Sequence, residues 1–124
     1  MAMGSILIVD DNLVSLKQIS ALLAKDYDVK LAKSGEMGLQ ICAQEQPNLI
    51  LLDVEMPGMD GFETIARLKA DASLKQIPVF FLTGNSDAET QAKCLAAGAV
   101  DFITKPADPE ALHKKIGQYL KVPA

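Results

Sequence analysis

Aromatic residues are scarce in this chain and tryptophan is absent: aromatic residues make up 5% of the sequence, whereas hydrophobic residues as a whole make up 49%. The core must therefore be built from Leu, Ile, Val and Ala, and few residues remain for aromatic binding platforms. Runs of Lys or Arg are missing as well, and 12 basic against 16 acidic residues give a net charge of −4. Because nucleic-acid-binding domains usually carry a basic surface, we expect no direct nucleic-acid binding.

Long hydrophobic runs are also missing. The longest apolar stretch is about six residues, far below the roughly 18 that span a bilayer, and no basic-then-apolar signal pattern opens the chain. We therefore expect a cytoplasmic protein without membrane contact. The cysteines Cys42 and Cys94 have no metal-type spacing and no neighbouring His, so we expect two small core hydrophobes with no redox role.

A chain of 124 residues fits one domain with one compact core. Residues 1–5 contain a second Met and a Gly-Ser pair, which is typical of an expression remnant. We expect residues 6–121 to form the domain and residues 122–124 a tail. Apolar strand-like runs alternate with helix-like segments in the order 6–10, 12–24, 28–31, 35–45, 49–53, 61–70, 79–83, 87–97, 100–103 and 109–120.

This alternation gives five βα units. Short continuous apolar runs suit a parallel sheet that is covered on both faces, and right-handed crossovers place helices on each face. The predicted fold is therefore α/β, a doubly wound parallel sheet in a three-layer sandwich. Ser34, Asp87 and Asp108 stand where helix N-caps are expected. The expected apolar stripe of the fourth helix is Ala88, Ala92, Leu95 and Ala99. That of the fifth helix is Leu112, Ile116 and Leu120.

Five polar residues follow the apolar runs: Asp10, Asp11, Asp53, Thr83 and Lys105. The carboxyl ends of parallel strands share one edge of a sheet, and ligands of open α/β sheets bind there. We therefore expect three carboxylates, a hydroxyl and an ammonium in one pocket. This combination predicts a phosphate and metal site.

Adjacent carboxylates need a neutralising partner, because like charges about 5 Å apart repel by roughly 3 kcal/mol at an effective dielectric near 20. Mg²⁺ would resolve the repulsion, since it takes oxygen ligands from one or two carboxylates plus a phosphate. A helix N-cap role would explain either Asp10 or Asp11, but not both. Asp53 is followed by a Pro- and Gly-containing loop that leaves its carboxylate accessible as a nucleophile toward phosphorus, with Thr83 and Lys105 stabilising the transferring oxygens.

These residues carry a resemblance to the receiver domain of bacterial two-component response regulators, including the chemotaxis regulators. The resemblance covers residues 6–120, and identity, order and spacing of its motifs all agree. The matching segments are Val9-Asp10-Asp11-Asn12, Leu52-Asp53-Val54-Glu55-Met56-Pro57-Gly58-Met59-Asp60-Gly61, Leu82-Thr83-Gly84 and Asp101-Phe102-Ile103-Thr104-Lys105-Pro106.

The resemblance implies that Asp53 is the phosphoacceptor and that Mg²⁺ is the cofactor. It implies Asp10, Asp11 and Asp53 as metal carboxylates, and Glu55 as a ligand through its backbone carbonyl. Thr83 and Lys105 would then bind the phosphoryl group. It also implies the strand order 2-1-3-4-5, which is the order of the chemotaxis member of the family. The phosphodonor would be a histidine kinase or a phosphotransfer protein, and the chain would be a switch rather than an enzyme.

Phe102 stands at the aromatic switch position of the family, where Tyr is common. Because Phe lacks the tyrosine hydroxyl, we expect the switch to act through packing of the ring and not through a hydrogen bond. Phosphorylation would draw Thr83 toward the phosphoryl group and let Phe102 turn inward. Glu55 and Asn85 stand where the family tunes the access of water. The changed face, built from the fourth helix, fifth strand and fifth helix, would bind an effector or a second copy of the chain. Its expected output residues are Lys93, Asp101, Lys114, Lys115 and Tyr119.

Two other interpretations stay open. A haloacid-dehalogenase-type phosphatase also uses a strand-end Asp nucleophile, but its motif needs a second Asp two residues later, where this chain has Glu55. A degenerate receiver that serves only as an interaction module is the other, although every key side chain is present. His113 is expected to be exposed and to have no catalytic role. The chain is either a stand-alone regulator or a receiver excised from a longer protein.

Overall fold

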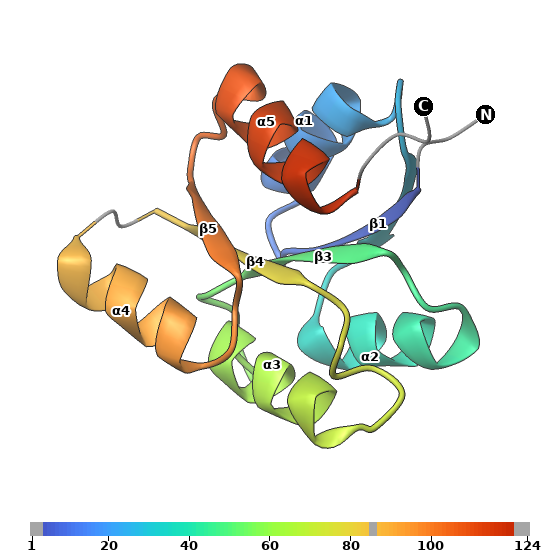
Figure 1. The fold of residues 1–124 in the computed structure, drawn as a ribbon, viewed down its shortest axis with the longest axis vertical. Helices are drawn as coiled ribbons and strands as arrows, with labels where there is room; N and C mark the ends of the chain where they lie inside the picture. Colours follow the sequence, from blue (N-terminus) through green and yellow to red (C-terminus); the bar gives the residue numbers. More distant parts are fainter. Residues whose placement is uncertain (1–3, 85–86, 121–124) are drawn as a thin grey trace.

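The structure is a computed structural model that describes residues 4–84 and 87–120, in which five strands alternate with five helices (Figure 1). The strands are β1 (Ser5–Val9), β2 (Asp28–Ala32), β3 (Leu49–Asp53), β4 (Val79–Thr83) and β5 (Asp101–Thr104). The helices are α1 (Leu13–Leu23), α2 (Gly35–Gln44), α3 (Gly61–Ala70), α4 (Ala88–Ala96) and α5 (Pro109–Tyr119). None of the described helices is long and apolar enough to cross a membrane.

The strands form one parallel sheet in the order β2-β1-β3-β4-β5, as predicted. All residues of the central strands β3 and β4 are buried, which explains why their sequences are continuous apolar runs rather than alternating ones. In the pairing of β4 with β5, Phe81 lies opposite Phe102 and Thr83 lies opposite Thr104. β5 is an edge strand.

Helices cover both faces of the sheet. Figure 1 shows α1 and α5 on one side and α2, α3 and α4 on the other. Each face has its own core cluster, because alternate residues of a strand point to opposite sides. Ile6 and Ile8 of β1 pack with α1 and α5, whereas Leu7 and Val9 pack on the side of α2 and α3. The predicted doubly wound, three-layer sandwich is confirmed.

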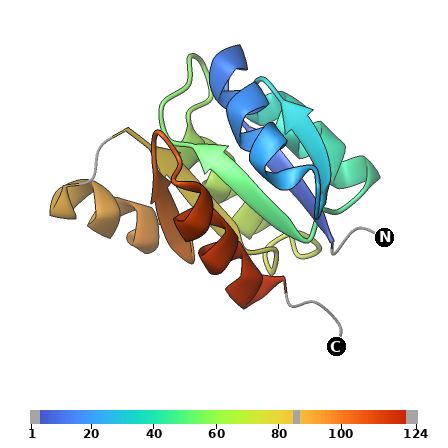
Figure 2. The same ribbon diagram turned by 90° about the horizontal axis from the view of Figure 1, so that it is seen from above.

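The predicted helix faces are confirmed for α5 but not for α4. Leu112, Ile116 and Leu120 are buried in the cluster beneath α5. In α4, by contrast, Leu95 is 51% exposed and the only buried residue is Cys94. Figure 2 shows α4 at one end of the molecule, beside β5. Because α4 covers only the edge of the sheet and carries many small alanines, its apolar spacing did not define the buried face.

The three predicted N-caps are confirmed. The Ser34 side chain accepts a hydrogen bond from the Met37 N–H at 3.1 Å. Asp87 and Asp108 cap α4 and α5 in the same way. Such caps satisfy N–H groups that have no partner inside the helix.

The described part of the chain begins at Gly4, so residues 1–3 and the tail at 122–124 lie outside it, as does Asn85. Ser5, which we assigned to an expression remnant, is the first residue of β1. Its backbone N–H donates to Asn48 Oδ1 at 2.8 Å, and its position in the strand lies opposite Asp28 of β2. The sheet therefore begins one residue earlier than the apolar run suggested.

Both cysteines are buried free thiols, as expected for core residues. Burial raises the pKa of the Cys42 thiol to about 11, and it also raises the pKa of Cys94. Neither thiol therefore has appreciable thiolate character at neutral pH.

The start of α3 approaches β3 so closely that only glycine fits there. The Gly61 N–H donates to Val54 O at 3.0 Å, and a Cβ at Gly61 would lie 2.3 Å from Asp53 O. We expect Gly61→Ala to lower the free energy of unfolding by about 1 to 3 kcal/mol, since the backbone must shift to relieve the clash.

The matched control is Gly117→Ala in α5, where an added Cβ meets nothing within 4 Å. This substitution should raise stability by about 0.5 to 1 kcal/mol, because alanine is the better helix former. Urea unfolding of both variants measures the difference. Equal stability of the two variants would contradict the close approach at Gly61.

Candidate functional site

The predicted residues meet at the carboxyl edge of the sheet. Asp10 and Asp11 follow β1, Asp53 ends β3, Thr83 ends β4, and Lys105 follows β5. They line a cavity of about 280 Å³, together with Asn12, Val54, Glu55 and Gly84. The parallel topology therefore brings together side chains that are up to 95 positions apart in the sequence.

Lys105 is the ammonium of this site and contacts two of the carboxylates. Its Nζ lies 2.7 Å from Asp10 Oδ2 and 3.2 Å from Asp53 Oδ1. Asp10 is fully buried and also accepts a hydrogen bond from the Asn12 N–H at 2.9 Å. Asp11, in contrast, is exposed at the mouth of the cavity. The helix cap next to it is Asn12, so neither aspartate is used as the N-cap of α1.

The three carboxylates form the acidic cluster, defined here as Asp10, Asp11 and Asp53. Each offers an oxygen within 4.8 Å of the others, and no other group of three or more acidic, His or Cys side chains with this geometry occurs in the described residues. One ammonium cannot neutralise three carboxylates. Hard oxygen ligands of this kind are those that Mg²⁺ prefers, so the cluster fits a divalent cation.

The Asp53 carboxylate, which we expected to be exposed, is buried at the end of β3, and its surroundings disfavour its charge. Burial raises the pKa of the Asp53 carboxyl, the negative charge of Asp10 raises it further, and Lys105 lowers it. The net result is a pKa of about 6 for the protein without a cation. Asp53 is thus a carboxylate that would gain from a nearby positive charge.

Lys105 stays protonated despite being partly buried. Burial alone lowers its pKa, but the hydrogen bond with Asp10 and the charges of Asp53 and Asp10 outweigh this effect. The pKa of Lys105 is therefore raised above its usual value. The site keeps a fixed positive charge beside the Asp53 oxygen.

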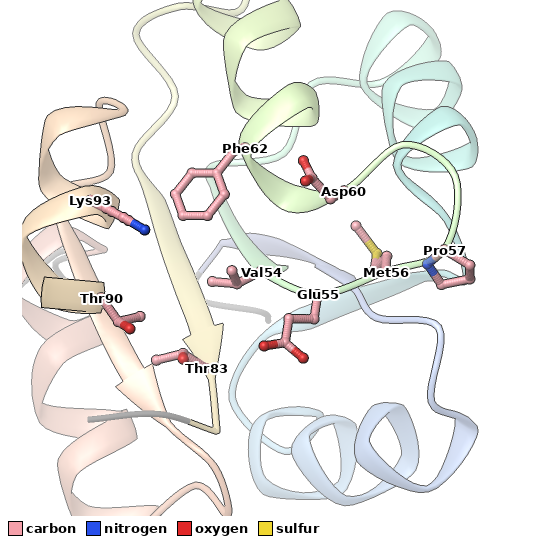
Figure 3. A pocket seen from close by; sticks show the side chains of 9 residues that line it. All are labelled: Val54, Glu55, Met56, Pro57, Asp60, Phe62, Thr83, Thr90 and Lys93. Atoms are coloured by element: carbon pink, nitrogen blue, oxygen red, sulfur yellow. The ribbon is translucent and has the colours of Figure 1, made fainter. Parts of the chain in front are cut away.

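A second cavity, of about 580 Å³, adjoins the first one (Figure 3). The two share Val54, Glu55 and Thr83. Figure 3 shows the Thr83 and Glu55 side chains beside this opening, with Thr90 and Lys93 entering from α4. Thr83 itself is buried, whereas Glu55 is exposed. Thr83 therefore lies between the acidic cluster and the space beneath α4.

Some of the predicted output residues contact one another and others do not. Asp101, Phe102 and Lys115 are in contact at the edge of the sheet. Lys93 lies 3.6 Å from Glu89 on its own helix, and the exposed Tyr119 ring packs edge-on against Phe80. Lys114 is exposed on α5.

His113 is only partly exposed and faces the end of α1. Its Nδ1 lies 2.8 Å from Pro109 O, and its Nε2 lies 3.9 Å from Asp26 Oδ2. It therefore packs away from the acidic cluster. Sequence reasoning missed the contact of Lys115 with the Phe102 ring, because a lysine on an amphipathic helix carries no signal of its partner. It also missed that Asn12 is the N-cap of α1, so that neither Asp10 nor Asp11 is needed for capping, although Asn is a common N-cap residue.

A doubly wound sheet with an acidic, lysine-containing cavity at its carboxyl edge defines a phosphate- and metal-handling α/β domain. Residues 6–117 match the response regulator receiver domain family, and the chain belongs to this family. It is thus a phosphoacceptor domain of two-component signalling, and the match favours this prediction over the phosphatase alternative.

Individual relatives agree with the family. The chain is 36% identical to the protein PilH of Pseudomonas aeruginosa over 119 residues, which covers 95% of this chain and 98% of PilH. The structure of the chemotaxis protein CheY4 of Vibrio cholerae matches with a TM-score of 0.89 at 31% identity, over 96% of this chain and all of CheY4. Other curated relatives are longer, and the chain spans from about a quarter to about a half of their length.

A further solved structure bears on the metal. The receiver domain of the sensor histidine kinase PA1611 from Pseudomonas aeruginosa matches with a TM-score of 0.87 at 27% identity. The match covers 94% of this chain and 97% of that domain. That structure holds a magnesium ion coordinated in its active site cleft.

Removing the charge of Asp53 should stabilise the metal-free protein. The folded-state pKa of Asp53 lies above its ordinary value of 3.8, so the folded state loses stability as the pH rises from about 4 to about 6. We expect Asp53→Asn to raise the free energy of unfolding at pH 7.5 in EDTA by about 1 to 3 kcal/mol, and the gain to disappear below pH 4.

Urea unfolding with and without Mg²⁺ tests this expectation. Mg²⁺ should stabilise the wild type and reduce the difference from Asp53→Asn, since a ligand that binds only the folded state raises its stability. Asp28→Asn is the control, because Asp28 is exposed at the opposite end of the sheet. A wild type that is insensitive to Mg²⁺ would contradict a cation site in the acidic cluster.

Proposed function

We propose that this chain is a phosphorylation switch in which the Asp53 carboxylate accepts a phosphoryl group once per signal. The observation that carries the proposal is the position of Asp53: it ends β3, beside two further carboxylates and 3.2 Å from the Lys105 ammonium. An Asp53 oxygen would form a bond to phosphorus while the bond from phosphorus to the donor breaks, and the donor leaves with that electron pair.

Asp10, Asp11 and Asp53 would hold Mg²⁺, together with the backbone carbonyl of Glu55. When bound, the cation supplies positive charge to the phosphoryl oxygens. Lys105 supplies a second positive charge next to the Asp53 oxygen, and its pairing with Asp10 fixes the direction of its long side chain. The Thr83 hydroxyl would donate a hydrogen bond to a phosphoryl oxygen.

Membership of the family implies a histidine kinase as partner. In our proposal a histidine kinase or a phosphotransfer protein presents the phosphoryl group at the open mouth beside Asp11 in the cytoplasm, and residues 6–121 form the domain that receives it. The chain turns over no substrate of its own. It catalyses only its own phosphorylation and the hydrolysis that ends the signal.

The register of the sheet supports Thr83 and Phe102 as the switch. Phe102 lies opposite Phe81, and Thr83 is two residues beyond Phe81 on the same face of β4. A movement of Thr83 toward the phosphoryl group would therefore free space on the face that Phe102 occupies. To change the active fraction from 1% to 99%, phosphorylation must favour the active state by about 5.5 kcal/mol.

The output surface in this proposal consists of Lys93, Asp101, Lys114, Lys115 and Tyr119. Its occupant is an effector or a second copy of the chain, which binds when Phe102 has moved. Light scattering with and without beryllofluoride distinguishes the two, because only a second copy doubles the mass. The same surface would serve whether the domain acts alone or within a longer protein.

Acetyl phosphate with Mg²⁺ should transfer a single phosphoryl group to the wild type and none to Asp53→Asn. Intact-protein mass spectrometry measures the product, and peptide mapping locates it. We also expect Lys105→Met to reduce the rate at least tenfold, since the positive charge beside the transferring oxygens is lost.

Three outcomes separate the alternatives. One stoichiometric modification at Asp53 supports the switch. An unmodified Asp53 would favour a degenerate receiver that acts only as an interaction module. Continuous turnover of a phosphomonoester would favour a phosphatase.

A further inference from the structure

The ammonium of Lys115 contacts the proposed switch residue Phe102 in two ways. Its Nζ donates to the backbone oxygen of Phe102 at 3.0 Å and lies 4.8 Å from the centre of the Phe102 ring. It also pairs with Asp101 Oδ1 at 3.2 Å. A cation at this distance over an aromatic face is attracted by the negative potential of the ring.

Lys115 reaches Phe102 around the open edge of the sheet. Its helix, α5, packs on the side of Leu112 and Ile116, whereas the Phe102 side chain packs against the cluster on the opposite side. The two can meet only because β5 is the edge strand, with no further strand in the way. This geometry places the cation at the outer side of the ring.

The Lys115 ammonium is anchored by atoms that do not belong to the Phe102 ring. Lys115 is bound to the backbone of Phe102 and to Asp101, whose Oδ1 also accepts the Phe102 N–H at 2.8 Å. Rotation of the Phe102 side chain toward Thr83 moves the ring and leaves these anchoring atoms in place. The contact between cation and ring is therefore specific to the partly buried ring position seen here.

We propose that Lys115 is a positioning residue that holds the Phe102 ring in the partly buried position seen here and so sets how much of the unphosphorylated protein is active. This inference rests on the proposed switch role of Phe102. A cation–π contact of a partly exposed lysine changes an equilibrium about two- to fivefold. Because the apparent affinity for a ligand scales with the competent fraction, loss of the contact should strengthen binding of a phosphoryl analogue by the same factor.

The test compares Lys115→Met with Lys115→Arg, which keeps the cation, and Lys114→Met, which removes the same charge from an exposed neighbour. Beryllofluoride binding in Mg²⁺ should tighten about two- to fivefold in Lys115→Met and stay within error in Lys115→Arg. Loss of a positive charge by itself would weaken binding of an anion. The expected change thus has the opposite sign to a general electrostatic effect, which Lys114→Met measures.

Ring signals of Phe102 give a readout that needs no ligand. The chain has four phenylalanines, so NMR of ¹³C-labelled Phe resolves them, and Phe102→Leu identifies the signals of interest. In Lys115→Met these signals should shift toward their positions in the beryllofluoride-saturated wild type, with stronger contacts to the Thr83 methyl group. In the Phe102→Leu background, Lys115→Met should no longer change beryllofluoride affinity.

The inference is overturned if Lys115→Met matches Lys114→Met in both measurements, or if its effect on affinity persists without the Phe102 ring. Failure of the proposed function looks different, because the wild type itself would then bind no beryllofluoride. In that case stronger NMR contacts between the Phe102 ring and the Thr83 methyl group in Lys115→Met still support the positioning role, and unchanged contacts refute it.

Discussion

Repulsion among three carboxylates held at one edge of the sheet dominates the electrostatics of this domain. Asp10, Asp11 and Asp53 share a small cavity with a single ammonium, so the site has excess negative charge. Burial of Asp53 removes the water that would solvate its charge, and together with the negative charge of Asp10 it raises the pKa of the Asp53 carboxyl. In our proposal this cluster lowers the stability of the metal-free domain, and it provides affinity for a cation and a reactive carboxylate.

Tightly packed strands hold the acidic cluster in place. β3 and β4 are buried along their whole length, and α3 begins so close to Asp53 that only glycine is accommodated. Lys105 is positioned by the carboxylates that it neutralises, which orders an otherwise flexible side chain. For phosphorylation to change a surface away from Asp53, our proposal needs an element that is less tightly packed. α4 buries only Cys94, and β5 lies at the sheet edge, so this end of the molecule can be rearranged at low cost.

In our proposal, a short run of side chains on one face of β4 and β5 connects the acidic cluster with the end of the molecule formed by α4 and β5. Thr83 lies at the boundary of two cavities, and Phe102 lies on the neighbouring strand. With phenylalanine in place of tyrosine, no ring hydroxyl is available to stabilise either position by hydrogen bonding. In our inference, packing and the contact with the Lys115 ammonium then determine the position of the Phe102 ring.

The class of fold and the set of residues at the strand ends could be predicted from the amino-acid sequence, because apolar runs, helix caps and the position just after a strand are all local features of the chain. The strand order was predicted from the family resemblance. Packing in three dimensions was needed to show which face α4 buries, that Ser5 belongs to the sheet, and that Lys115 meets Phe102 around an edge. Such contacts join residues through packing of separate elements, and no spacing in the sequence records them.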